Sequence, residues 1–450
     1  MYDITIIGAG VSGIFAAHTL IQKDLRILMI DIGKRLEERD CPLDRGESCH
    51  CDSCAKYVGF GGLGKSEGKY NYTNDFGGDL ESKVGYDFAL KLMEEVDHTL
   101  CQYGGDQAVM YSTENPSLVR KAKKAGFEIL STKVRHLGTR LSESVLQRMF
   151  ERLKTTMDFR FQTEVSRIHK KDDYFELIIS GDSKSIFSKK VILATGRSGN
   201  EWLSDQCASL GILQNLTRVD LGIRVEMPGN QLDSILQDSF ETKLQYVGEG
   251  FTATTYCMNP KGRIIRKYQD GLVMADGQNY REQVNGSSNL NFTLFVPRYF
   301  STLQEANQYV HSIIGAINQG GDRILAQRFG DLQENRATSA TTMSHNRVTP
   351  TLSADYGSLR QEVPDLYIQS VQLFFDSLEK LLEQPIDEDT LLYALDGKFY
   401  SPRIKTDTRF ETEVSHLYVI GDCSGITHSL SQAAASGIHV GKSLLQEKTL

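Results

Sequence analysis

Three glycines near the start of the chain are spaced for binding a phosphate group through the backbone. They lie in the run GAGVSG at residues 8–13. In this spacing the first glycine permits a tight turn, the second lets a diphosphate approach the backbone, and the third lets a helix pack closely on a strand. The N–H groups at the start of that helix also favour negative charge. The residues predicted to hold a dinucleotide here are Gly8, Gly10, Val11, Ser12 and Gly13.

The elements that would position these glycines follow from the neighbouring residues. Residues 3–7 (DITII) predict a strand, IFAAHTLI predicts a helix after the glycines, and residues 26–30 predict a second strand that ends at Asp31. A carboxylate about twenty residues after the glycines can accept a hydrogen bond from a ribose hydroxyl. Strand, glycine turn, helix, strand and acid together predict a Rossmann-like α/β unit with a parallel sheet.

A later segment bears on whether the dinucleotide is NAD or FAD. Three short strand-like runs, near residues 164–168, 174–179 and 185–187, precede an apolar strand at 191–194 that leads into an ATG turn. This β-meander followed by an ATG strand resembles the glutathione-reductase-type FAD fold, in which the meander replaces a crossover helix. The resemblance implies that the cofactor is FAD and that it contacts Val165, Ala194, Thr195 and Gly196.

The C-terminal segment repeats the order of strand, turn and helix. Residues 416–420 (HLYVI) predict a strand, and a helix rich in small residues, QAAASGIHVGKSLL, follows a short turn. Small side chains would let this helix pack tightly beneath the cofactor, and its N-terminal amides would favour negative charge on a reduced flavin. The fold resemblance implies that Asp422 binds the ribityl or diphosphate part of FAD. The residues predicted to contact FAD here are Gly421, Asp422, Gly425, Ile426 and Thr427.

A second glycine-rich segment, residues 59–68 (GFGGLGKSEG), lies in a long irregular stretch between residues 34 and 79. Successive backbone amides in such a segment can face a flavin or its phosphates. The residues predicted to do so are Gly62, Leu63, Gly64, Lys65 and Ser66. The sequence has no second GxGxxG on a strand-to-helix turn, so NADH or NADPH is expected only as a transient electron donor near the flavin.

Several longer segments resemble one family. They are residues 41–78, VRHLGT at 134–139, VDLGIRVEMP at 219–228, CMNPKGRII at 257–265 and QRFGDL at 327–332. Together they resemble the uncharacterised FAD-dependent dehydrogenase family, also called NAD(FAD)-utilising dehydrogenases, of bacteria and archaea. The portion GKSEGKYNYTN is also similar to the flavin segment of the family that contains bile-acid double-bond reductases. The resemblance implies an FAD-binding oxidoreductase and leaves the substrate open.

The pattern of apolar residues changes from about residue 213, where strand-like runs are followed by helical ones. This change predicts a second, α+β domain with an antiparallel sheet. We predict an FAD-binding domain at 1–212 and 404–450, which carries the cysteine- and glycine-rich loop 34–79, and an inserted substrate or cap domain at 213–403. The polar segment 331–355 is expected to be a mobile loop over the site.

Flavin chemistry needs few side chains, because the cofactor carries the hydride while the protein supplies position and electrostatics. Useful partners are an acid that protonates the substrate and a cation that holds an anionic or carbonyl group. By position, the candidate catalytic residues are Arg135, His136, Tyr70 and His428. Each of them also has a purely structural interpretation, as a hydrogen-bonded or packing residue.

Four of the eight cysteines cluster at Cys41, Cys49, Cys51 and Cys54. Clustered thiols can ligate zinc or an iron–sulfur cluster, form a redox-active dithiol, or remain ordinary reduced thiols. The Cys-x-Cys-x-x-Cys spacing is not that of a zinc finger, and the run has no second CxxC nearby. We therefore predict no metal and leave the redox and inert interpretations open.

Composition narrows the class of protein further. The 450 residues include 50 Lys and Arg against 58 Asp and Glu, a net charge of −8 that repels phosphate backbones and anionic membranes. The sequence lacks an apolar run near the roughly 20 residues that a membrane helix needs. No basic region precedes the apolar stretch 4–17 and glycines interrupt it, so we expect a strand and a helix there and not a signal peptide. We expect a cytoplasmic protein that binds a small-molecule substrate and neither nucleic acid nor membrane, in an oligomeric state that the sequence leaves open.

The function predicted from the sequence is that of an FAD-dependent oxidoreductase. It would transfer a hydride between flavin N5 and an organic substrate, by C=C or C=N reduction or desaturation, with the flavin recycled by NAD(P)H. Two alternatives stay open. One is a flavin oxidase or monooxygenase, and the other is a non-catalytic flavoprotein redox sensor that uses the Cys41–Cys54 cluster.

Overall fold

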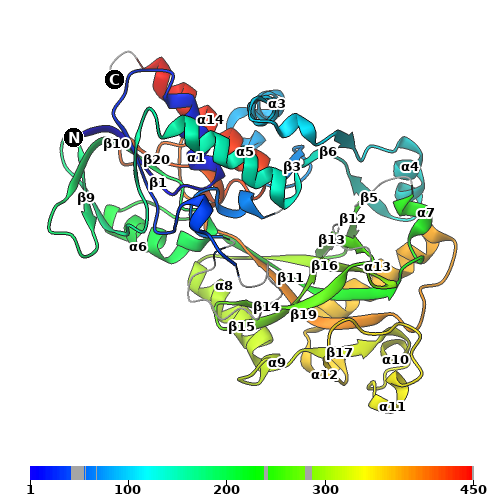
Figure 1. The fold of residues 1–450 in the computed structure, drawn as a ribbon. Helices are drawn as coiled ribbons and strands as arrows, with labels where there is room; N and C mark the ends of the chain where they lie inside the picture. The colour runs from blue at the N-terminus through cyan, green and yellow to red at the C-terminus, as the bar shows by residue number, and fades with distance from the viewer. Residues whose placement is uncertain (42–54, 56, 67, 238–241, 279–285, 448–450) are drawn as a thin grey trace. The chain divides into compact units, whose positions relative to one another are not determined.

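Each of two units in the chain has its own sheet and its own apolar core (Figure 1). The computed structural model describes residues 1–41, 55, 57–66, 68–237, 242–278 and 286–447. Unit 1 consists of Met1–Ser112, Thr132–Thr217 and Tyr400–Leu450, and unit 2 consists of Thr113–Ser131 and Arg218–Phe399.

One segment belongs to a different unit from the one expected. The sequence-based boundaries assign residues 113–131 to the dinucleotide-binding domain, but these residues are part of unit 2. The reason is strand pairing, since β5 (Phe127–Leu130) pairs antiparallel with β12 (Lys243–Gly248) at the end of the large sheet of unit 2. Such pairing between distant segments leaves no local signal in the sequence.

Parallel strands form the centre of unit 1. They lie in the order β7 (Asp158–Arg160), β2 (Ile27–Ile30), β1 (Tyr2–Ile7), β10 (Ile186–Leu193) and β20 (Leu417–Val419), each parallel to its neighbour. The first residues of β10 pair antiparallel with β9 (Phe175–Ile179), which in turn pairs with β8 (Val165–Lys170). The predicted fold class, a Rossmann-like parallel sheet with a β-meander, is therefore confirmed.

The strand β10 corrects one detail of the prediction. The sequence suggests separate strands at 185–187 and 191–194, because polar residues interrupt the apolar pattern between them. The structure has one continuous strand, in which Ser188 and Lys190 are buried. The ammonium group of Lys190 pairs with the carboxylate of Glu447, so its burial is compensated by a charge far away in the sequence.

Both faces of the parallel sheet are buried, as the continuous apolar runs of its strands require. On one face Ile6 and Met29 join an apolar cluster with residues of α1 (Val11–Leu20), α5 (Gly138–Leu153) and α14 (Leu430–Gln446). On the other face Ile30 and Val191 join a cluster with residues of α6 (Asn200–Leu210). Figure 1 shows α14 running alongside α1, and the two helices pack on each other.

A small antiparallel sheet and several helices complete unit 1. The sheet has the order β3-β6-β4. The remaining elements of this unit are η1 (Leu36–Glu38), η3 (Gly62–Lys65), β3 (Lys69–Tyr72), α2 (Glu81–Val84), α3 (Tyr86–Gln102), η4 (Gly105–Gln107), β4 (Met110–Ser112), β6 (Lys133–His136), η5 (Arg197–Gly199) and η7 (Gly421–Ser424).

Unit 2 is built on a large, mainly antiparallel sheet, as expected for the second domain. Its order is β18-β17-β19-β11-β16-β13-β12-β5, with β17 and β18 parallel, and β14 and β15 form a separate hairpin. The helix α13 (Asp365–Leu382) packs on β12, β13 and β16. The other elements are α4 (Pro116–Lys124), β11 (Thr217–Pro228), α7 (Asp233–Leu236), β13 (Phe251–Pro260), β14 (Arg263–Gln269), β15 (Leu272–Gln278), β16 (Asn289–Phe300), α8 (Leu303–Val310), η6 (His311–Gly315), α9 (Ala316–Asn318), β17 (Leu325–Arg328), α10 (Phe329–Gln333), α11 (Ala340–Met343), β18 (Asp355–Tyr356), α12 (Leu359–Glu362) and β19 (Leu391–Phe399).

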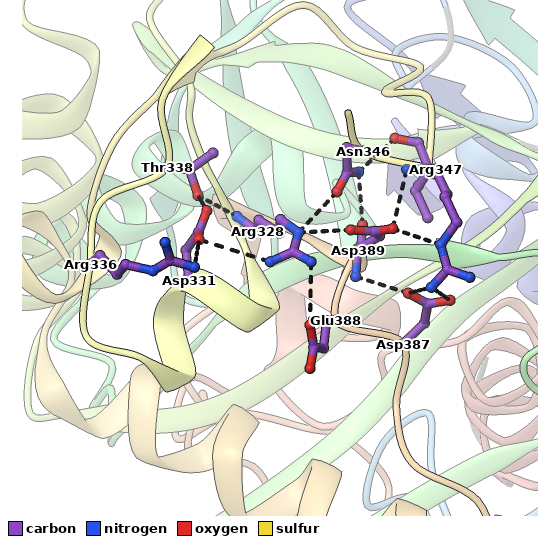
Figure 2. Close-up of polar contacts among 10 residues, drawn as sticks. Arg328, Asp331, Arg336, Thr338, Asn346, Arg347, Asp387, Glu388 and Asp389 are labelled. Atoms are coloured by element: carbon purple, nitrogen blue, oxygen red, sulfur yellow. Dashed lines mark hydrogen bonds and ion pairs between the residues drawn. The ribbon is translucent and has the colours of Figure 1, made fainter. Parts of the chain in front are cut away.

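The segment 331–355 is fixed by side chains where the sequence suggests a mobile loop. Figure 2 shows that Asp389 accepts hydrogen bonds from Arg328 (2.7 Å) and from Arg347 (2.8 Å). Near the start of the segment, buried Asp331 accepts a hydrogen bond from the hydroxyl of Thr338 (2.7 Å). The polar residues that suggest mobility are therefore the anchors of this segment.

No helix in the described residues combines the length and the apolar character needed to cross a bilayer.

Candidate functional site

Four predicted site segments meet at one edge of the parallel sheet in unit 1. Gly8 follows β1, Asp31 follows β2, Ala194 follows β10 and Gly421 lies just after β20. These four strands are parallel, so their carboxyl ends share an edge. The carboxyl edge of an open parallel sheet is where nucleotides bind in doubly wound folds. The topology thus brings together residues that are hundreds of positions apart.

Two of the three motif glycines are required by the packing of the protein itself. Gly8 has φ +108°, and a Cβ there would overlap the carbonyl of Ala194. A Cβ at Gly13 would overlap the carbonyl of Gly8, so the third glycine lets α1 lie close against the turn. These two positions behave as the sequence motif predicts.

Gly10 is different, because neither its backbone angle nor its packing requires glycine. Its φ is −73°, a value that any residue adopts. Among the described residues, the only atom that a Cβ at Gly10 would approach is the carbonyl oxygen of Ala194, at 3.9 Å. The absence of a side chain leaves room for a ligand directly in front of the first turn of α1. A diphosphate at this place would meet the positive end of the helix dipole.

Asp31 holds the glycine turn in shape. Its carboxylate accepts a hydrogen bond from the backbone N–H of Ala9 (2.7 Å) and another from that of Gly33 (2.7 Å). Burial raises the pKa of Asp31, and the two backbone hydrogen bonds and the charge of Arg39 oppose that rise. Each carboxylate oxygen has a further lone pair, so a ribose hydroxyl could still donate to Asp31.

The second glycine-rich segment lies directly on the first glycine turn. The backbone N–H of Gly61 donates to the carbonyl of Ala9 (2.8 Å), and a Cβ at Gly62 would be 3.1 Å from the Cα of Gly10. The segment is held from behind by Ser142, whose hydroxyl donates to the carbonyl of Gly64. Residues 59–64 therefore lie at the same edge as the fingerprint, and their contact with a flavin stays a prediction.

The three side chains of this segment that are predicted to contact the cofactor differ in exposure and in their partners. The ammonium group of Lys65 donates to the carbonyl of Arg39 and lies 4.0 Å from Glu143, so it has partners within the protein. Leu63 is exposed, and Ser66 is half-buried. The predicted contact of Lys65 with a cofactor would have to replace or share these interactions.

The C-terminal turn also reaches the glycine motif. A Cβ at Gly421, which has φ +70°, would overlap the hydroxyl of Ser12. The backbone N–H of Gly421 donates to the hydroxyl of Ser436 in α14 (3.0 Å). Gly196, in the ATG turn, has φ +62° and no described atom within 4 Å of where a Cβ would be. Like Gly10, it leaves room at this edge.

Asp422 lies between two of the predicted cofactor segments. Its carboxylate is 3.5 Å from the guanidinium of Arg197, beyond the ATG turn, and accepts a hydrogen bond from Thr427 (3.3 Å). Gly425 has φ +70° and packs against the backbone of Arg403. The carbonyl of Ile426 accepts a hydrogen bond from the backbone of Asp79 (2.7 Å). The turn is therefore tied to both neighbouring segments.

Two predicted cofactor contacts have other partners in the structure. The carbonyl of Val165, expected to meet the adenine, accepts a hydrogen bond from the indole of Trp202 (2.6 Å). The small residues of α14, expected to lie beneath the cofactor, pack on α1, because a Cβ at Gly437 would overlap the carbonyl of Ser12. Ser429 caps α14, so one of its first amides is already hydrogen-bonded. Tight helix–helix packing explains these small residues without a ligand.

Arg135 has a structural role in place of the predicted substrate contact. Its guanidinium forms a double hydrogen bond with Asp97, at 2.6 and 2.9 Å, and also donates to the carbonyl of Ala108. The hydroxyl of Tyr72 donates to the same carboxylate (2.7 Å). This buried network joins β6 to α3, and it leaves the guanidinium committed to protein partners.

The other three catalytic candidates are dispersed in unit 1. Tyr70 is fully buried in β3; burial raises its pKa, and its hydroxyl has no hydrogen-bond partner among the described residues. His136 is opposite Lys69 in the pairing of β3 with β6. The ring of His428 meets the ring of Tyr400 edge-on at 4.5 Å, in the C-terminal turn. Of the three, His428 lies in a predicted cofactor segment.

The cysteine cluster falls mostly outside the described residues. Cys41 is buried, and Cys49, Cys51 and Cys54 are not described. Among the residues that the structure does describe, no group of His, Cys, Asp and Glu could hold a metal ion. Two other thiols are buried in unit 1: burial raises the pKa of Cys207 and of Cys423 to about 11.

Comparison with solved structures finds distant likenesses to several proteins. No family model and no curated protein matches the chain. The crystal structure of CtdE in complex with FAD and substrate 4 has a TM-score of 0.41 and 10% identity, over 100% of this chain and 82% of that chain. Glycine oxidase from Geobacillus kaustophilus has a TM-score of 0.39 and 10% identity, over 100% and 95%. Halogenase PltM has a TM-score of 0.39 and 11% identity, over 99% and 68%. Likenesses this distant carry no argument about function, and the family named from the sequence stays a hypothesis.

Proposed function

We propose that the chain is an FAD-dependent oxidoreductase that transfers a hydride between flavin N5 and an organic substrate, by reducing or forming a C=C or C=N bond. The observation that carries the proposal is the position of Gly10. Glycine there has no explanation in backbone angle or packing, and the room in front of it lies at the start of a helix, at the carboxyl edge of a parallel sheet.

FAD, when bound, would supply the hydride chemistry, and the residues of the chain would bind and orient it. Gly10 and the first turn of α1 would face the diphosphate, and Asp31 would accept a hydrogen bond from the ribose. The segments 59–66, 194–196 and 421–427 border the same edge and would follow the cofactor toward the flavin. His428 is the proposed proton-transfer group, because it directly follows the last of these segments.

We propose NADH or NADPH as the electron donor. The sequence has no second GxGxxG on a strand-to-helix turn, so a nicotinamide nucleotide would bind transiently beside the flavin. The proposed location is cytoplasmic and the proposed partner is a small organic molecule.

The proposal is tested by mixing the purified protein, anaerobically, with NADH and with NADPH while the flavin absorbance is recorded. Rapid bleaching by either nucleotide, followed by reoxidation with an unsaturated substrate, is the expected result. Slow bleaching together with rapid peroxide formation in air would favour the oxidase or monooxygenase alternative. A colourless protein that fails to take up added FAD would contradict the cofactor assignment itself.

A further inference from the structure

One buried guanidinium organises the second glycine-rich segment. Arg39, just after η1, is 4% exposed. It donates hydrogen bonds to the backbone carbonyls of Ala55 (2.9 Å), Phe60 (2.6 Å) and Gly62 (3.0 Å). Three acceptors on one segment match the rigid, planar fork of donors that arginine offers and that lysine lacks.

The segment that Arg39 holds is the one that lies on the fingerprint turn. Gly61 donates to the carbonyl of Ala9, and Gly62 approaches the Cα of Gly10. The glycines leave space for the arginine, since a Cβ at Gly59 would be 3.0 Å from the Cδ of Arg39. Arg39 thus bonds the carbonyls on either side of Gly61, the residue whose N–H reaches the fingerprint turn.

The charge of Arg39 also acts at this edge of the sheet. It is close enough to Asp31 to oppose the rise in the pKa of that carboxyl caused by burial. A diphosphate that enters beside Asp31 adds negative charge next to an existing carboxylate. A buried cation nearby lowers the cost of bringing these charges together, because screening by water is weak there.

We propose that Arg39 is a positioning residue for the dinucleotide, which sets the affinity for FAD by holding residues 60–62 against the fingerprint turn. The inference rests on the proposed function, since it takes FAD as the ligand. It concerns a residue outside every predicted contact, because Arg39 acts through the glycine segment and need not touch the ligand.

The test compares Arg39→Lys with wild type and with a matched control, Arg323→Lys. Arg323 is also mostly buried and donates to a backbone carbonyl, but in unit 2. Each protein is stripped of flavin and titrated with FAD, with flavin fluorescence as the readout, and the melting temperature is measured without FAD. We expect Arg39→Lys to raise the FAD dissociation constant by about tenfold or more, and Arg323→Lys to leave it unchanged.

The outcomes separate the inference from the proposed function. If wild type binds FAD and Arg39→Lys binds it equally well, the Arg39 inference is overturned and the proposed function stands. If wild type itself binds no FAD, the proposed function fails first. If Arg39→Lys does not fold, amide hydrogen exchange is measured on wild type with and without FAD. We expect FAD to slow exchange in residues 57–66 and in residues 8–14 together. Unchanged exchange in residues 57–66 would overturn the inference.

Discussion

The hydroxyl of Ser12, in the first turn of α1, occupies the place where a side chain on Gly421 would have to go. This contact joins the N-terminal fingerprint to the C-terminal turn at one edge of the parallel sheet. A ligand bound at this edge would therefore border both the N-terminal and the C-terminal turn. Several outcomes that can be measured depend on this arrangement.

Replacing Gly10 by valine should weaken FAD binding without weakening the fold. Among the described residues, the Cβ of the valine would approach only the carbonyl oxygen of Ala194, at 3.9 Å, and the side chain would occupy the room that a diphosphate needs. We expect at least tenfold weaker binding, about 1.4 kcal/mol, with an unchanged melting temperature of the flavin-free protein. Gly321→Ala is the control, since Gly321 also has no atom closer than 3.7 Å to a Cβ. Equal FAD content in both purified variants would contradict the assignment.

Gly437→Ala should destabilise unit 1. A Cβ there would overlap the carbonyl of Ser12 in the packed pair α1 and α14, so the helices would have to separate. We expect a loss of about 1–3 kcal/mol in the free energy of unfolding, measured by denaturant titration of flavin-free protein. Gly315→Ala is the helical control, because its nearest atom is 3.7 Å from the Cβ. A loss no larger than that of the control would argue against tight packing of α14 on α1.

Stability should fall in acid through Asp97. Burial would raise the pKa of this carboxyl, but hydrogen bonds from Arg135 and Tyr72 outweigh burial and hold the pKa below its ordinary value. A folded-state pKa below the unfolded one means that the stabilisation is present above the unfolded value, about 3.9, and is lost as the pH falls through the folded value. Asp97→Asn should therefore melt lower than wild type near neutral pH, with the gap narrowing as the pH falls below about 3.9.

The control for Asp97→Asn is Glu94→Gln, an exposed position in the middle of the same helix. Its melting temperature should follow that of wild type at every pH. A constant gap between Asp97→Asn and wild type across the acid range would mean that the ion pair with Arg135 is not the titrating contact.

Loss of the Asp389 carboxylate should loosen the segment 331–355. Burial would raise the pKa of Asp389, but hydrogen bonds from Arg347 and Arg328 outweigh burial and lower the pKa, so the group is ionised at neutral pH. In Asp389→Asn we expect trypsin to cut after Arg347 several times faster, by mass spectrometry of limited digests. Asp173→Asn, at an exposed site in unit 1, should leave the cleavage rate unchanged. Equal rates in both variants would show that other contacts fix the segment.

The thiols of Cys207 and Cys423 should be inert in the folded protein. Burial raises the pKa of each to about 11, so little thiolate is present at neutral pH. A disulfide reagent should modify them only after denaturation, as peptide mapping can show. Rapid modification of either thiol in native protein would mean that this part of unit 1 opens readily.

Local signals predicted much of the fold. The GAGVSG turn and Asp31 identify the first strands and helix, because glycine spacing and apolar periodicity are properties of adjacent residues. Contacts between distant segments could not be predicted in this way. Lys190 is buried because it pairs with Glu447, and the residues of α14 are small because the helix packs on α1. In both cases the partner lies far away in the sequence, so the sequence alone does not reveal it.

At the candidate site, too, the residues identified by a local motif were predicted, and those defined by contacts with distant segments were not. Gly8, Gly10 and Gly421 meet at the carboxyl edge, as the fingerprint and the fold resemblance imply. The sequence suggests a substrate-binding cation at Arg135 because its partner Asp97 lies on another element. No sequence pattern identifies Arg39, because an arginine that bonds backbone carbonyls has no motif and only its three acceptors distinguish it.

Calorimetric titration of FAD into flavin-free wild-type protein tests the central claim most directly. We predict one FAD bound per chain with a dissociation constant of about a micromolar or tighter, and a visible flavin spectrum that changes on binding. Heat no greater than that of dilution, with an unchanged flavin spectrum, would contradict it.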